Sequence, residues 1–235
     1  NTVVGDQIDS DITLVDGKLV VTWQSETSST SNSFDIHTQN LIFGDNGLEL
    51  VGTSDQIIAN TNANEVDPQI TALTNGNAVI TWTEDSKIVA QIVDSSGNIV
   101  NNKFEIDGSD AKTSEVAALS NGAFMITWAS EGNIYAQQFD ANGSIDGTTI
   151  SLEIGNVGGL GDVYSFSPSI GFDKGGLSVM FDNSKVWLFN NISTSILSQT
   201  KLWEHNEEYK GAKINTSCSV EYNNVNGELK FVGIN

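Results

Sequence analysis

The sequence predicts an all-β protein, namely a β-propeller of five blades with four antiparallel strands in each blade. Two observations lead to this prediction. Five times along the chain a polar turn opens into a short apolar strand, and three of these strands end on tryptophan. The turn glycines recur at intervals of about 50 residues, a spacing typical of propeller blades. They are Gly17, Gly76, Gly122, Gly175 and Gly227.

The second copy of the repeat has the clearest strand pattern. Its first strand, DPQITA, alternates along the chain and leads into Asn75-Gly76, a strong hairpin signal because both residues accept a positive φ. The segments AVITW, KIVAQIVD and KFEID then supply three more strands, which completes one four-stranded blade. The five blade motifs fall near residues 9–23, 67–82, 114–128, 167–181 and 214–233.

The second strand of each repeat is apolar on consecutive residues, as in residues 78–80. Such a run is typical of a strand that is buried on both faces, so each blade is predicted to be covered by its neighbours. The aromatic residues at the strand ends are predicted to fill equivalent sites between blades. These residues are Trp23, Trp82, Trp128 and Phe181. No segment keeps a 3.6-residue period over three turns, so no helix longer than one turn is expected.

The ring is predicted to close through the N-terminal strand, residues 1–6, because the last copy of the repeat has only two strands. The expected domain is a single propeller over residues 1–235. A fragment of a larger propeller is the alternative, since the chain starts at Asn1 and either a leader was removed or a longer protein was cut.

Composition limits the possible partners. Thirty acidic and ten basic residues give a net charge of −20, and nucleic acid requires clustered Lys and Arg. No stretch approaches the roughly 18 apolar residues of a membrane span, so membrane insertion is not expected. The acidity fits either simple solubility or a calcium-rich extracellular setting. Cys218 is the only cysteine, which excludes an intrachain disulfide.

The second and third copies share a further pattern, in which Ala-Gln is followed by Asp and Gly. The residues that keep it are Tyr135, Ala136, Gln137, Phe139, Asp140, Gly143, Ala90, Gln91, Asp94 and Gly97, with Gln39 and Gly47 loosely in the first copy. Over residues 6–147 the chain resembles the tandem blade repeats of large bacterial and protist surface or secreted proteins, including adhesins and calcium-binding haemolysin-like proteins. This resemblance implies a propeller and an extracellular role, and it implies no catalytic residues.

One loop is a candidate calcium site. The segment DANGSID places oxygen-bearing side chains at alternate positions with a glycine for the bend, as calcium loops do. The candidate ligands are Asp140, Asn142, Ser144 and Asp146. The competing interpretation is a hairpin turn, because Asp, Asn and Gly tolerate left-handed φ. No cofactor is expected otherwise, and calcium is a possibility.

A single polar segment near the C-terminus is the candidate sugar-binding site. An exposed aromatic ring can stack on a sugar while neighbouring polar groups bind its hydroxyls. The residues that form this cluster are Trp203, Glu204, His205 and Tyr209. The alternative is that Trp203 covers a strand edge. Three sequons that could carry glycans begin at Asn142, Asn191 and Asn215.

Carboxylates of the first strands were compared as candidate catalytic groups, because some five-bladed propellers are glycosidases whose acids project into the axial funnel from first strands. Asp9, Asp67 and Glu115 lie eight, nine and seven residues before their turn glycines. The offsets differ, so they are interpreted as solvated strand ends that do not share one structural position. No nucleophile elbow and no paired transition-metal ligands occur either.

The sequence therefore favours a non-enzymatic, extracellular or cell-surface module that binds or scaffolds through propeller loops. Its expected partner is a protein or glycan ligand, or a second copy of the chain. A carbohydrate-binding lectin-like propeller is the first alternative, and a propeller glycoside hydrolase is the second.

Overall fold

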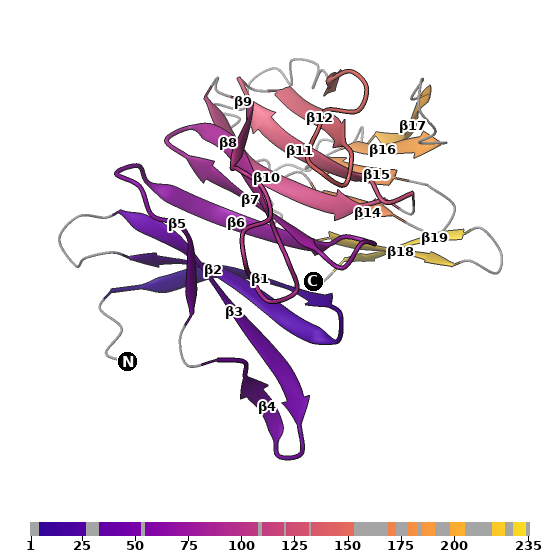
Figure 1. The fold of residues 1–235 in the computed structure, drawn as a ribbon. Coiled ribbons are helices and arrows are strands. Elements are labelled where there is room, and N and C mark those ends of the chain that lie inside the picture. The colour runs from indigo at the N-terminus through magenta and orange to yellow at the C-terminus, as the bar shows by residue number, and fades with distance from the viewer. Residues whose placement is uncertain are drawn as a thin grey trace. The chain divides into compact units, whose positions relative to one another are not determined.

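A computed structural model of the chain describes residues 5–26, 33–52, 55–107, 110–119, 121–131, 133–152, 169–172, 178–182, 185–190, 198–204, 218–223 and 228–233. All regular structure in these residues is β, in five antiparallel sheets (Figure 1). The chain divides into two compact units, Asn1–Ile170 and Gly171–Asn235, and each is described by itself. The prediction that residues 1–235 form a single domain stays a prediction.

Three sheets make up the first unit, and each begins with a blade motif predicted from the sequence. The first sheet has the order β1-β2-β3-β4, with β5 also paired to β3. The second and third sheets each run in sequence order. The strands are β1 (Gln7–Val15), β2 (Lys18–Glu26), β3 (Phe34–Gly44), β4 (Gly47–Leu50), β5 (Gln56–Ala59), β6 (Glu65–Ala72), β7 (Ala78–Glu84), β8 (Lys87–Val93), β9 (Phe104–Asp107), β10 (Ala111–Ala118), β11 (Phe124–Ser130), β12 (Asn133–Phe139) and β13 (Ile150–Leu152).

Two more sheets follow along the chain, again at predicted blade motifs. One has four strands in sequence order, and the other has two. Their strands are β14 (Ser169–Phe172), β15 (Ser178–Asp182), β16 (Lys185–Asn190), β17 (Ser198–Glu204), β18 (Cys218–Asn223) and β19 (Glu228–Gly233). The all-β prediction is confirmed, and the two strands predicted for the last repeat are present among the described residues. The predicted closing strand falls mainly on residues 1–4, which lie outside the described residues.

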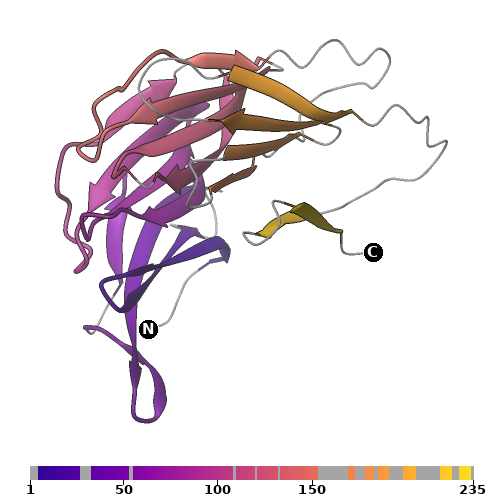
Figure 2. The same cartoon turned by 90° about the vertical axis from the view of Figure 1, so that its right-hand side faces the viewer.

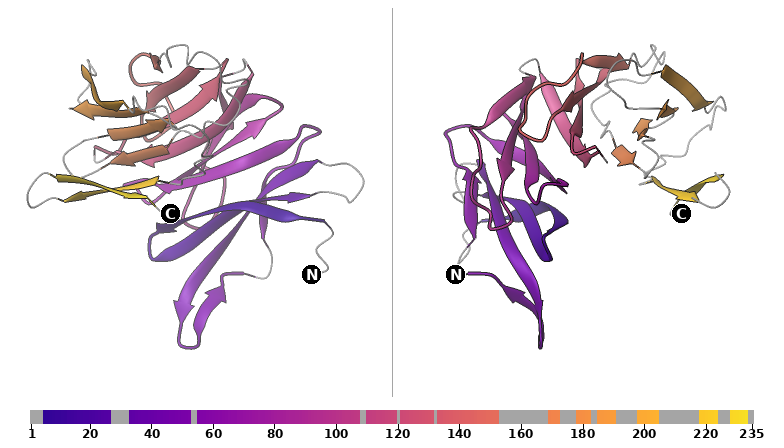
Figure 3. Two further views of the ribbon diagram at one scale, coloured as in Figure 1. Left: turned by 180° about the vertical axis from the view of Figure 1, so that it is seen from behind. Right: turned by 45° about the vertical axis from the view of Figure 1, so that its right-hand side comes forward.

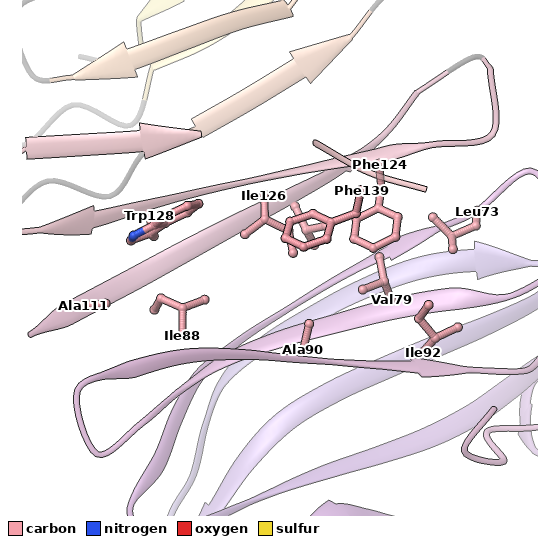
Figure 4. Packing of buried hydrophobic residues seen from close by; sticks show 11 residues of the cluster. Leu73, Val79, Ile88, Ala90, Ile92, Ala111, Phe124, Ile126, Trp128 and Phe139 are labelled. Atoms are coloured by element: carbon pink, nitrogen blue, oxygen red, sulfur yellow. The ribbon is translucent and has the colours of Figure 1, made fainter. Parts of the chain in front are cut away.

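Within the first unit the three sheets stack face to face, which Figures 2 and 3 show from several sides. The core between the second and third sheets is built from both of them, with Phe124 stacked on Phe139 at 5.4 Å between ring centroids (Figure 4). A second core lies between the first and second sheets and includes Val20, Ile36 and Trp82. The apolar runs of the second and third sheets are therefore buried on both faces, as the sequence predicts, whereas Leu19 and Val21 in the first sheet are only half-buried.

The strand-end tryptophans differ in burial. Trp82 and Trp128 are fully buried, whereas Trp23 is half-buried. Trp23 follows Thr22 and precedes Gln24, which faces the second sheet and accepts a hydrogen bond there from the backbone N–H of Asp67. Successive side chains of a strand point to opposite faces, so Trp23 lies on the far face, where its ring packs near His37.

The Ala-Gln signature of the repeat has a structural explanation. In each of the three sheets the Gln amide nitrogen donates to its neighbour's carbonyl and to the carbonyl of a residue that leads to the outer strand. The three glutamines are Gln39, Gln91 and Gln137. The glutamine side chain thus donates to backbone carbonyls. Buried carbonyl groups need such a partner.

The Asp-x-x-Gly part of the signature makes a tight turn. The carboxylate of Asp94 accepts the N–H groups of Ser96 and Asn98, and Gly97 has a φ of +85°. Only a residue without a Cβ adopts this conformation without strain. Asp140 and Gly143 repeat the same arrangement in the third sheet.

Phe124 provides a test of the stacked core. Phe124→Ala should lower the free energy of unfolding by about 3–5 kcal/mol, because it deletes a fully buried ring and leaves a cavity. The matched control is Phe43→Ala on the projecting β3–β4 hairpin, where the ring is 72% exposed and the expected change is within about 0.5 kcal/mol. Urea unfolding measures both. Equal losses in the two variants would contradict the assignment of the core.

Candidate functional site

The first strand of each sheet in the first unit contains a β-bulge at an equivalent place. The register shifts between Ile8 and Asp11 in β1, between Val66 and Gln69 in β6, and between Lys112 and Ser114 in β10. One residue in each bulge has a left-handed φ: 50° at Asp9, 55° at Asp67 and 43° at Thr113. Bulges of this kind redirect a side chain and are frequent next to functional sites.

The register corrects the interpretation of the first-strand acids as unrelated strand ends. Asp9 and Asp67 occupy the same bulge position, although they lie at different distances from their turn glycines. The reason is turn length. Val15 pairs with Lys18 across a two-residue turn in the first sheet, whereas the second sheet has a longer turn that begins with Leu73.

A second set of equivalent positions lies just after the bulge. Asp11, Gln69 and Glu115 each pair with the threonine that precedes the strand-end tryptophan in their sheet. Sequence reasoning missed Asp11 and Gln69 because the offsets were counted from the glycine. Counting from the tryptophan would not have removed the error, because the turn lies between the two strands.

Two pairs of these acids interact electrostatically. Burial and, to a lesser extent, the negative charge of Asp11 raise the pKa of Glu115 from its ordinary value of 4.5 to about 7. Burial, followed by the charge of Asp9, raises the pKa of Asp67 above its ordinary value. Strand β6 contacts both β1 and β10, so carboxyl groups from three neighbouring first strands gather in one region.

Hydrogen bonds fix the backbone around these acids. The Asp11 carboxylate accepts the N–H of Ile12 at 2.8 Å through one oxygen and the N–H of Ile70 at 2.8 Å through the other. The buried side chain of Gln24 accepts the N–H of Asp67 at 2.8 Å. The hydrogen bonds from Ile70 to Asp11 and from Asp67 to Gln24 join the first sheet to the second. Asp11 therefore positions β6 relative to β1 and carries charge near Glu115.

This arrangement suits general acid–base chemistry. A carboxyl group that titrates near neutral pH can donate a proton in its acid form, and a neighbouring carboxylate can act as a base or nucleophile. Hydrolysis of a glycosidic bond uses such a pair. Glu115 fits the first role, and the Asp9–Asp67 pair fits the second.

The predicted calcium loop is a hairpin turn in the structure. One Asp140 oxygen accepts the N–H groups of Asn142 and Ser144 at 2.9 Å each, and Asp146 accepts the amide of Gln138. In the part of the chain that the structure describes, no group of three or more His, Cys, Asp or Glu side chains could hold a metal ion. Calcium binding by Asp140, Asn142, Ser144 and Asp146 stays a prediction.

The other predicted site residues are only partly described. Trp203 and Glu204 end strand β17, where their backbones pair with Val186 and Lys185. His205, Tyr209, Asn191 and Asn215 lie outside the described residues. Asn142, the remaining sequon, is exposed on its turn. Among the described residues, no helix has the length and apolar character needed to span a membrane.

Solved structures are similar to the chain in fold. The GH43_1 enzyme from Xanthomonas citri complexed with xylotriose matches with a TM-score of 0.52 and 11% identity over 83% of this chain and 73% of that one. RS223-Beta-xylosidase matches with a TM-score of 0.52 and 10% identity over 83% and 77%. The exo-beta-1,3-galactanase 1,3Gal43A from Clostridium thermocellum matches at 0.51 and 13% over 85% and 49%. No protein-family model and no curated protein matches the chain.

These neighbours show the fold. The chain is a β-propeller. The propeller part of the predicted resemblance is confirmed, and the adhesin and haemolysin-like part is not shown. The prediction of a non-enzymatic binding or scaffolding module is wrong, because the structural neighbours are named as enzymes that act on glycans. The error arose because the acids of the first strands were judged to be scattered.

The pKa of Glu115 gives a test that needs no substrate. The folded state holds this proton above the ordinary pKa, so its stabilising effect is present below pH 4.5 and is lost as pH rises to about 7. Glu115→Gln keeps the shape without the titration. The free energy of unfolding of E115Q should therefore increase relative to that of the wild type between pH 4.5 and about 7. Above this range the difference between the two proteins should stay constant.

Urea unfolding between pH 4 and 8 measures the effect. The control is Glu105→Gln, which changes an exposed carboxyl that pairs with Lys87, and its profile should run parallel to the wild type. Parallel profiles for E115Q as well would show that Glu115 does not hold a proton in the folded state.

Proposed function

We propose that the chain is a glycoside hydrolase in which Glu115 is the general acid. The observation that carries this proposal is the pKa of Glu115, raised to about 7 on a first strand that lies among other carboxyl groups. The fold shared with a xylosidase and a galactanase supports it. A glycan is accordingly the proposed partner.

The roles follow from the chemistry of glycoside cleavage. The leaving oxygen needs a proton, and Glu115 holds one at neutral pH. The opposite face of the sugar needs a carboxylate that activates water or attacks the anomeric carbon. Asp9 and Asp67 share a left-handed backbone in adjacent sheets, and the charge of Asp9 acts on Asp67; we assign these two carboxyl groups the second role.

Turnover of aryl glycosides tests the proposal. We expect hydrolysis of at least one member of a panel of nitrophenyl xylosides, arabinosides and galactosides by the wild type. Glu115→Gln should lower kcat by about 10²–10⁴-fold, the usual contribution of an acid catalyst. Glu105→Gln, away from the site, should leave it unchanged. Activity should fall as pH rises through about 7, because Glu115 then loses its proton.

The leaving group separates the acid from a structural role. A good leaving group such as dinitrophenolate departs without protonation, whereas an alkoxide does not. E115Q should therefore lose far less activity on dinitrophenyl glycosides than on alkyl glycosides. An equal loss on both classes would refute the role as general acid. Glycan binding with no turnover on any substrate would refute the hydrolase and favour the lectin-like alternative.

The setting is a separate proposal. A secreted or cell-surface location would fit the net charge of −20, since carboxylates meet cations in a calcium-rich exterior. Calcium as a cofactor and self-association of the chain stay predictions.

A further inference from the structure

Two buried acids outside the proposed site lie where the first and second sheets meet. The N–H of Phe34 donates to the side chain of Asn64 at 3.1 Å. The next residue of each segment is an acid, Asp35 on β3 and Glu65 on β6. The hydrogen bond thus brings the starts of these two strands, and their carboxyl groups, together.

Each of these acids has one oxygen without a partner. Asp35 is 6% exposed and Glu65 is fully buried. Asp35 Oδ1 and Glu65 Oε2 form no hydrogen bond, whereas Glu65 Oε1 accepts the hydroxyl and the N–H of Thr61 at 2.5 and 3.1 Å. An unsatisfied buried polar atom destabilises the folded state, and more so when it is charged.

We propose that Asp35 and Glu65 share one proton, held between Asp35 Oδ1 and Glu65 Oε2, and that this acid pair joins the first and second sheets. One proton converts one of the two unpaired oxygens into a donor and the other into its acceptor. Without it, two like charges would stand side by side with unsatisfied oxygens. The pair then titrates as a unit.

Electrostatics agree with this arrangement. Burial raises the pKa of Asp35 above its ordinary value, against the opposing effects of the His37 charge and of the Glu65 carboxyl group, which donates a hydrogen bond to Asp35 when it is protonated. Burial also raises the pKa of Glu65, and the charge of Asp35 adds to the rise, while the hydrogen bonds from Thr61 oppose it.

The surrounding charges are already engaged. On β3, His37 Nδ1 pairs with Asp55 at 2.5 Å. On β7, Glu84 lies opposite Glu65 and raises the pKa of Glu65 slightly, but it pairs with Lys103. The charged groups that face the acid pair thus form two ion pairs of their own. His37 lowers the pKa of Asp35 but does not bring it down to its ordinary value, and Lys103 is paired with Glu84.

A metal ion is a poorer occupant than a proton. Calcium takes six to eight oxygen ligands, and here two oxygens are unpaired. No group of three or more metal-binding side chains occurs among the residues that the structure describes. A proton satisfies two oxygens, which matches the number present.

The consequence is a pH-sensitive contact between sheets. Because the folded pKa values are raised, the stabilisation is fully present below the ordinary carboxyl pKa values and is lost as pH rises through the folded ones. A rise in pH through the folded pKa values should therefore weaken the contact between the first and second sheets.

The test replaces the shared proton by an amide. In Glu65→Gln the two donors of Thr61 fix the carbonyl oxygen at the Oε1 position, so the NH₂ group points at Asp35 Oδ1. The exchange is made in the E115Q protein, so that the titration of Glu115 does not contribute. As pH rises from the ordinary carboxyl pKa values to the folded ones, the unfolding constant of E115Q should increase relative to that of E115Q/E65Q. The increase should be up to about tenfold per pH unit, as expected for one proton.

Infrared spectroscopy gives a second readout. At a pH just above the ordinary carboxyl pKa values, the E115Q protein should show the C=O stretch of a protonated carboxylic acid, and E115Q/E65Q should show less of it. Asp35→Asn replaces Glu65→Gln if that variant does not fold. Parallel pH profiles, or equal infrared bands, would overturn the proposal. Stabilisation by millimolar calcium that vanishes in E115Q/E65Q would also overturn it and identify a cation as the occupant.

Discussion

The structure depends on the burial of apolar strands on both faces. Strand β7 has six consecutive buried residues, and no single sheet can cover such a strand on both sides. Each sheet must therefore pack against a neighbour, as the cores on either side of the second sheet show. Since the first strands of successive sheets then lie side by side, the stacking of hydrophobic surface also brings their polar residues together.

The β-bulges of the first strands place carboxyl groups in the candidate site by changing the direction of their side chains. A regular first strand would direct alternate side chains into the two intersheet cores, where a carboxyl group would be costly. The extra residue at Asp9 and at Asp67 breaks the alternation. The polar contacts of Asp11 and Gln24 across the two sheets hold the distorted strands in place. The bulges remove backbone hydrogen bonds within each sheet, and the hydrogen bonds between the two sheets compensate for this loss.

The sequence predicts the fold better than the site for a physical reason. Glycine turns, apolar runs and the Ala-Gln pattern act within one sheet, so the strands around Gly76 and Gln91 were predictable from local residues. The relation between Asp9 and Asp67 is not local. It depends on turn length, because two residues separate Val15 from Lys18 whereas three separate the hydrogen-bonded Leu73 and Asn77. It also depends on bulges that the residue types do not predict. Trp203 and its neighbours rested on composition alone, and the structure does not describe their side chains.

A comparison of the residues after the bulge in the three sheets shows which side chains the fold accepts at this position. Three sheets carry Asp11, Gln69 and Glu115 there, opposite equivalent threonines. Gln69 has nearly the shape of a glutamate without its charge, so the fold accepts a neutral side chain at this place. In the third sheet, desolvation and the neighbouring charge of Asp11 instead raise the pKa of Glu115 to about 7, which lowers stability at neutral pH. A chain that needed only stability would gain from glutamine in the third sheet as well. An acid at this position, where glutamine would be more stable, supports the proposed chemical role of Glu115.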